Sequence, residues 1–332
     1  MTRHLRRWYV YVPLSILILG FLLWRTRVWE AAHLLAEAEP LPLVGALVLD
    51  VVIIVLWAGR SGLLLADLGS RIPIRDLVPI VSFANTVNGV TPASAGEVLR
   101  AVVLHQRHAV PYRDGVAVIV LERFYALYLI AVATAAAWLA TGAEPTMLAV
   151  VGLVAAGAAF IPSAVYSAGV RVSGIGVGIS RRAPVGRTRL LELARRLVEV
   201  EDVVARFLVS ARPAIVFVAF TTTVFLAMDL QLLLIAGAIG VSIDPILGWL
   251  ALGLGAVAGI VSALPFGLGA ADAVIAAVLI AAGVAPAEAG LITVLQRLIA
   301  TLPTGLIGAA SYVYLMRSAP AMPQATPTDR PD

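Results

Sequence analysis

Acidic and basic side chains lie close to glycine and proline in two separate stretches of an otherwise apolar chain. In the first stretch Glu97 and Arg100 follow a Gly/Pro break, and the adjacent residues Glu122 and Arg123 close it. Charges and broken helices are costly at bilayer depth, so such stretches are typical of transport pathways and binding sites. A guanidinium offers a planar fork of donors that fits phosphate, so Arg123 is a candidate phosphate ligand.

The second stretch repeats this arrangement near the other end of the chain, with Asp272 and Arg297 in the places of Glu97 and Arg123. The predicted break residues are Gly89, Pro92 and Gly96 in the first stretch and Pro265, Gly267 and Gly269 in the second. Helix N-termini that follow these breaks point positive dipole ends at an anion. Because the two arginines hold equivalent positions, we expect them to bind a phosphate group from opposite leaflets in turn.

The acids have several roles open to them. Glu97 and Asp272 could pair with the two arginines when no lipid is bound, contact a cationic headgroup, or carry a coupling proton. The alternative is purely structural: Glu97 would pair with Arg100. The neighbouring Glu122 and Arg123 would then form a second ion pair, and both pairs would pin the hairpin.

Three further polar residues lie at predicted bilayer depth. Asn85 and Asn88 come just before the first break, where we expect them to satisfy freed backbone groups rather than contact substrate. Asp229 lies inside an apolar segment and is a functional candidate, with an ion pair to Arg297 as the alternative.

The composition places these residues in a membrane protein. The chain has 332 residues, of which 61% are hydrophobic and 13% charged, and its mean hydropathy is +0.96. A soluble domain is about half apolar and about a quarter charged, so we expect an all-α polytopic integral membrane protein. The chain has no cysteine, and its four histidines lack metal-like spacing, so no metal or cofactor is expected. A net charge of +4 does not indicate a nucleic-acid partner.

Apolar runs and breaks divide the chain into parts. We expect an N-terminal transmembrane anchor at 1–40, a first repeat at 41–170, a cytoplasmic amphipathic basic linker at 171–210, a second repeat at 211–316 and a disordered tail at 317–332. The broken hairpins are expected at 77–107 and 246–284. Full spans are expected near 8–24, 41–58, 115–141, 147–168, 213–238 and 287–315, and Arg60 is expected in the loop after the second.

The length of the half-helices bears on the topology. A crossing helix needs about 20 residues, so each broken pair is predicted to be re-entrant, which leaves six full spans. Arginines gather in the loops of one side, which predicts a cytoplasmic membrane location with both termini cytoplasmic. Three spans separate the hairpins, so the second repeat is inverted relative to the first. The alternative is eight spans, which charge counting does not separate from six.

The motifs TPASAGEVLR followed by LER, and PFGLGAAD followed by a G-x-x-P turn and QR, are similar to those of the lysylphosphatidylglycerol synthase transmembrane (flippase-like) family. The resemblance covers roughly 41–314 and implies a lipid flippase domain. The second family motif typically ends in Glu, where this chain has Asp272. In the synthases this domain is fused to a cytosolic aminoacyl-transferase domain. This chain ends shortly after its last predicted span, so we expect a stand-alone membrane domain.

These observations predict a lipid transporter that is not itself an enzyme and that moves an anionic phospholipid or lipid-linked intermediate through the bilayer. The expected substrate-binding residues are Arg123, Arg297, Glu97, Arg100, Glu122, Asp272, Asn85, Asn88 and Asp229. The alternatives are a non-transporting membrane partner of a separate lipid-modifying transferase and a small-solute transporter. An intramembrane enzyme acting on lipid phosphates ranks below these, because no buried histidine is predicted.

Overall fold

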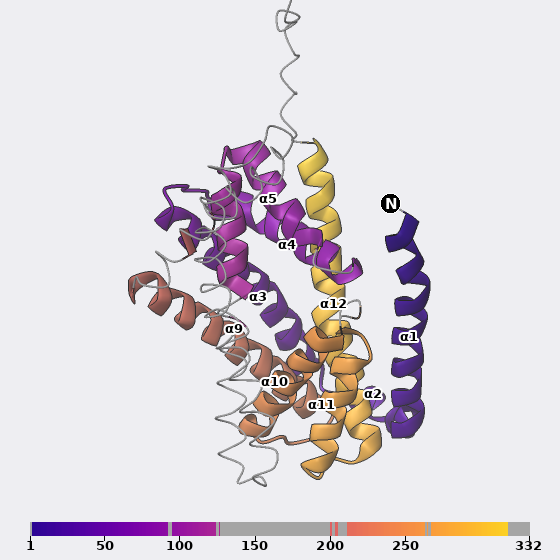
Figure 1. Cartoon of the computed structure of the whole chain (residues 1–332). Helices are drawn as coiled ribbons and strands as arrows, with labels where there is room; N and C mark the ends of the chain where they lie inside the picture. Colours follow the sequence, from indigo (N-terminus) through magenta and orange to yellow (C-terminus); the bar gives the residue numbers. More distant parts are fainter. Residues whose placement is uncertain are drawn as a thin grey trace, which may run out of the picture.

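The structure is a computed structural model that describes residues 2–91, 95–123, 126, 200, 203–204, 211–262, 264 and 267–317. Every regular element in these residues is a helix, which confirms the expected all-α polytopic membrane architecture (Figure 1). The helices are α1 (Thr2–Thr26), η1 (Val28–Ala31), α2 (Leu34–Glu37), α3 (Pro40–Asp67), α4 (Ile74–Val90), α5 (Ala95–His108), α9 (Ala211–Ala238), α10 (Pro245–Ser262), α11 (Ala270–Ala281) and α12 (Pro286–Arg317). Residues 112–123 are also helical.

Three of the described helices, α3, α9 and α12, are long and apolar enough to cross a membrane. Helices α9 and α12 begin and end within two residues of the predicted spans at 213–238 and 287–315. Helix α1 contains the predicted first span at 8–24. Long apolar runs without internal breaks were therefore sufficient to place these helices.

Helix α3 continues beyond its predicted end, and the placement of Arg60 in a loop is wrong. A charge after Ala58 suggested the end of the span, but the helix runs to Asp67. The Arg60 guanidinium lies 4.8 Å from the centre of the Phe217 ring of α9, and its side chain is only 12% exposed beside Glu122. A stacked and neutralised arginine does not have to end an intramembrane helix.

The first broken hairpin consists of α4 and α5, which pack against each other. Leu77 of α4 and Leu104 of α5 share an apolar cluster with Leu315 of α12, and the Arg107 guanidinium donates to the carbonyl of Leu315. The outer ends of α4 and α5 thus lie together at the end of the bundle that contains Arg317. We call it the Arg317 end.

The turn of this hairpin lies beside the middle of α12. The Thr86 hydroxyl of α4 donates to the carbonyl of Thr304, 3.0 Å away, near the centre of α12. Gly96 follows the break, and a Cβ there would collide with the Ala84 carbonyl oxygen. Glycine is required because the start of α5 approaches the backbone of α4 this closely.

The second broken hairpin consists of α10 and α11 and enters from the opposite end of the bundle. Leu279 of α11 shares an apolar cluster with Ala31 of η1 and Ala289 of α12. We call this the η1 end. The turn contains Gly267 and Gly269, with φ angles of 62° and 86°, a region that favours glycine.

Figure 1 shows α4 and α5 near one end of α12, and α10 and α11 near the other. Each pair turns back inside the bundle, as re-entrant hairpins do, and the two enter from opposite ends. This is the inverted arrangement expected for the two broken segments. The predicted span 147–168, most of the span 115–141, most of the linker and tail, Pro92 and Pro265 lie outside the described residues.

Candidate functional site

The guanidinium of Arg123 bonds to the acid in the first turn of α5. Its Nη2 donates to Oε1 of Glu97 at 2.7 Å. The Arg123 side chain is 52% exposed, whereas that of Glu97 is 12% exposed. This is the pair expected in the absence of lipid, and Arg123 is its accessible member.

Behind this pair lies a buried network centred on Glu122. Arg100 Nη2 lies 2.5 Å from Glu122 Oε2 and 3.1 Å from Glu97 Oε2. The Ser61 hydroxyl of α3 donates to Glu122 Oε1 at 2.5 Å. Arg60 Nη2 approaches Glu122 Oε2 at 3.9 Å. The expected ion pair between Glu97 and Arg100 is present, and it extends into a larger network.

The expected ion pair between Glu122 and Arg123 is wrong. Glu122 turns inward to Arg100, while Arg123 turns to Glu97. Adjacent residues of a helix do not face each other, so the two charges bind partners on different sides of their helix.

The N-terminus of α5 is capped by residues from both sides of the break. The backbone N–H of Glu97 donates to Asn88 Oδ1, and Asn88 Nδ2 donates to Glu97 Oε1, both at 3.1 Å. Asn88 therefore satisfies a freed backbone group, as predicted. The Asn85 side chain makes no hydrogen bond with any residue that the structure describes. The Glu97 carboxylate also occupies the positive end of the helix dipole.

The first cluster, which we define as Arg60, Arg100, Arg123, Glu97 and Glu122, carries a net positive charge. Three guanidinium groups face two carboxylates, which leaves one charge unbalanced within the cluster. All 24 basic residues of the chain are arginines. Guanidinium groups keep their charge when buried, so the three positive charges of this cluster are permanent.

The second cluster joins α11 to α12 around one ion pair. Arg297 donates from Nε and Nη2 to Asp272 Oδ1, at 2.9 and 2.6 Å. Asp272 Oδ2 accepts from the backbone N–H of Gly269 at 2.8 Å. The Asp272 side chain is 2% exposed and that of Arg297 is 21% exposed. The pair occupies the position in the second repeat that Glu97 and Arg123 occupy in the first.

The two clusters differ in charge. Gln296 precedes Arg297 where Glu122 precedes Arg123, and it donates to Gln231 of α9 at 2.9 Å. Gln231 in turn donates to the carbonyl of Ala46 in α3 at 2.9 Å. The ion pair between Asp272 and Arg297 is balanced, so among the described residues the second cluster carries no net charge, whereas the first carries one positive charge.

The ion pair between Asp229 and Arg297, the alternative to a functional role for Asp229, is also wrong. Arg297 makes two hydrogen bonds to Asp272. Asp229 faces the first turn of α10, where a Cβ on Gly248 would lie 2.5 Å from Asp229 Oδ1. The structure therefore separates Asp229 from the ion pair of the second cluster.

Sequence reasoning missed three residues. Arg60 and Ser61 belong to the first cluster but lie beyond the predicted end of their span. Asp50 lies within the predicted span 41–58, is 4% exposed, and accepts a hydrogen bond of 3.2 Å from the Thr304 hydroxyl. An acid in the middle of an apolar span was a sufficient signal for Asp50. No comparable signal marked Ser61.

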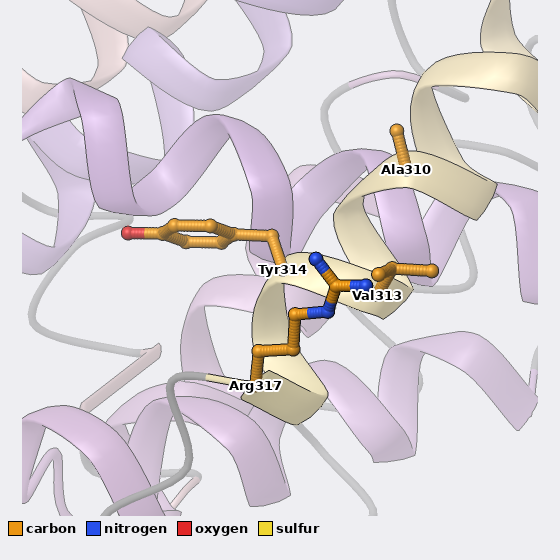
Figure 2. Close-up of a pocket in the computed structure, with 4 residues that line it drawn as sticks. All are labelled: Ala310, Val313, Tyr314 and Arg317. Carbon is orange, nitrogen blue, oxygen red and sulfur yellow. The ribbon is translucent and has the colours of Figure 1, made fainter.

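A hollow of about 430 Å³ lies along the last turns of α12, lined by Ala310, Val313, Tyr314 and Arg317 (Figure 2). These residues share one helix face because they are three or four positions apart. Twenty residues separate Arg317 from Arg297, which is about 30 Å along an α-helix. Tyrosine and arginine at a helix end are typical of a membrane interface, so we do not include this hollow in the candidate site.

Re-entrant hairpins that enter from opposite ends, each with an acid–arginine pair, define an inverted-repeat α-helical membrane protein. Residues 9–308 match the family described as "Lysylphosphatidylglycerol synthase TM region". The match covers nearly the whole chain, so the protein belongs to this family. This confirms the resemblance that its two sequence motifs indicated.

A shorter match joins the chain to Glycosyltransferase AglD of Haloferax volcanii. The two are 34% identical over 102 residues, which is 31% of this chain and 16% of that protein. The match covers less than a fifth of the relative, but it links part of the chain to a protein named for sugar transfer.

Proposed function

We propose that the protein moves an anionic phospholipid or lipid-linked intermediate across the cytoplasmic membrane, with both termini in the cytoplasm. The observation that carries this proposal is the positive charge of the first cluster together with the 52% exposed side chain of Arg123. Membership of the lysylphosphatidylglycerol synthase transmembrane family supports a lipid-related role in the membrane.

A lipid phosphate binds by replacing Glu97 on Arg123. After the exchange, Glu97 keeps its ion pair with Arg100 at 3.1 Å and its hydrogen bond from the Asn88 amide. Glu97 Oε2 is already buried without a hydrogen bond, and the exchange leaves no further buried acceptor without a partner, which limits the cost of breaking the ion pair. Exchange at Arg123 therefore requires little rearrangement of the cluster.

Arg297 receives the phosphate in the opposite half of the cycle. When Arg297 turns to the lipid, Asp272 would keep the hydrogen bond that it accepts from the backbone N–H of Gly269. Because the second cluster is neutral, it holds an anion less strongly than the first. This difference favours uptake at the first cluster and release at the second.

Vesicles that contain the purified protein and fluorescently labelled phosphatidylglycerol test this function. The fraction of label that an external quencher cannot reach reports lipid movement. We expect Arg123→Ala to slow this movement most and Arg297→Ala to slow it less. If both variants move lipid at the wild-type rate, the site assignment is wrong.

A second candidate function is a membrane domain that serves a separate lipid-modifying transferase without moving lipid itself. The match to a protein named as a glycosyltransferase favours it. In both proposals this chain has no catalytic step of its own. Copurification with a transferase whose activity depends on this protein, in vesicles that show no lipid movement, would support the second.

A further inference from the structure

Asp50 is a buried acid near the middle of α3 that belongs to neither cluster. Its side chain accepts a hydrogen bond from Thr304 of α12 at 3.2 Å. Gln231 of α9 lies one turn away, where its carboxamide donates to the carbonyl of Ala46, in the same helix as Asp50. We propose that Asp50 takes up and releases the proton that drives lipid movement. This inference rests on the proposed transport function.

Asp50 has no cationic partner in the part of the chain that the structure describes. Among the described residues no arginine forms an ion pair with it, and the sequence from 124 to 170, which holds the remaining predicted spans, contains no lysine or arginine. Arg60 lies ten residues further along α3, about 15 Å away along the helix. An unpaired carboxylate at bilayer depth is costly, and binding a proton removes the charge.

Charged groups on the neighbouring helices also face elsewhere. On α12, Arg297 is bound to Asp272. On α9, Asp229 faces α10. On α4, the only charged residues are Arg75 and Asp76 in the first turn, at the Arg317 end. The charged groups that the structure describes on these helices therefore leave Asp50 without a neighbouring charge, so its charge is free to change with its proton.

The neighbours of Asp50 suit a proton better than a metal ion. The Thr304 hydroxyl donates to the carboxylate, and the oxygen of the nearby Gln231 side chain already accepts from Gln296. Hard metal cations need several oxygen ligands. A hydroxyl can both donate and accept, so Thr304 can donate to the carboxylate and accept from the protonated acid.

A chain of hydrogen bonds leads from Asp50 to the first hairpin. The Thr304 hydroxyl donates to Asp50, and the Thr304 carbonyl accepts from Thr86 of α4 at 3.0 Å. On the other side, Gln231 bonds to Gln296, the residue before Arg297. A proton on Asp50 changes its hydrogen bond to Thr304, and through Thr304 and Thr86 this change acts on the first hairpin.

Charge balance fixes the driving force. One proton moving with a lipid of one negative charge carries no net charge, so a pH gradient drives the cycle and a membrane potential does not. One pH unit corresponds to about 1.4 kcal/mol, a factor of about ten in the lipid distribution at steady state.

The test uses full-length protein in vesicles with labelled phosphatidylglycerol outside and a pH-sensitive dye inside. Wild type is compared with Asp50→Asn and with Asp67→Asn, which removes an exposed acid at the end of the same helix. With a gradient of one pH unit, we expect the lipid distribution to shift about tenfold in wild type and in Asp67→Asn. Asp50→Asn should move lipid without responding to the gradient. A wild-type response in Asp50→Asn would overturn the proposal.

Infrared difference spectroscopy separates this inference from the transport function. A carbonyl band of a protonated carboxylic acid should titrate with pH in wild type and be missing in Asp50→Asn. If wild type moves no lipid, the transport function is wrong, and this band still decides whether Asp50 binds a proton. If Asp50→Asn does not fold, Thr304→Val replaces it, and an unchanged band then overturns the assignment to Asp50.

Discussion

Replacing Arg123 should separate lipid binding from stability, because its side chain is accessible while its partners stay satisfied. Arg123→Ala removes a pair that is half exposed, and such pairs contribute about 0–1 kcal/mol to stability. A charge-assisted hydrogen bond to phosphate contributes about 1.5–3 kcal/mol. We therefore expect lipid movement at limiting lipid to fall about ten- to hundredfold, with an almost unchanged unfolding temperature.

Arg100→Ala should, in contrast to Arg123→Ala, mainly lower the stability of the protein. Arg100 is 5% exposed and bonds to Glu122 at 2.5 Å, and breaking one side of a buried ion pair costs about 3–5 kcal/mol. Glu122 would keep its hydrogen bond from Ser61 and its longer contact with Arg60. The variant should unfold at a clearly lower temperature in detergent, whatever its transport rate.

Arg113→Ala is a matched control for the exposed arginine. Its side chain is 54% exposed and pairs with Asp114 at 3.2 Å, outside the first cluster. Lipid movement and unfolding temperature are measured on the same preparations of all three variants. The reasoning is refuted if Arg123→Ala transports like Arg113→Ala, or if Arg100→Ala is as stable as Arg123→Ala.

Two further predictions concern the hairpins. Gly96→Ala should destabilise the protein by about 1–3 kcal/mol or more, because the new Cβ meets the Ala84 carbonyl oxygen. Gly305→Ala, which meets nothing within 4 Å, should be neutral or stabilising by up to about 1 kcal/mol; equal unfolding temperatures would contradict this. Because the chain has no cysteine, single cysteines report sidedness without background. Cysteines placed at Arg75 and at Arg113 should react with an impermeant maleimide from the same side of the membrane, and a cysteine placed at Glu37 should react from the other side. Labelling at positions 75 and 113 from opposite sides would exclude a re-entrant hairpin.

The long apolar helices and both breaks could be predicted from the sequence because their signals are local. The apolar runs of α9 and α12 have no competing charge, and glycine and proline mark the turns after Val90 and Ser262. The acid–arginine pairs could be predicted because the two stretches repeat each other, with Glu97 and Asp272 at equivalent positions.

The errors concern residues whose role depends on distant partners. Arg60 looked like the end of a span because nothing nearby in sequence neutralises it, whereas Glu122 lies beside it in the fold. Glu122 and Arg123 looked like a pair because they are neighbours in sequence, but helix geometry points them apart. An ion pair between Asp229 and Arg297 rested only on their similar predicted depth in the membrane. In the fold Arg297 bonds to Asp272 instead.

The absence of lysine has a consequence for how the molecule senses acidity. A guanidinium does not lose its proton at any pH that a cell reaches. No basic side chain in the two clusters can therefore act as a switch by becoming neutral. Within these clusters a response to acidity must therefore come from a carboxylic acid, so measurements on their few buried acids are enough to locate it.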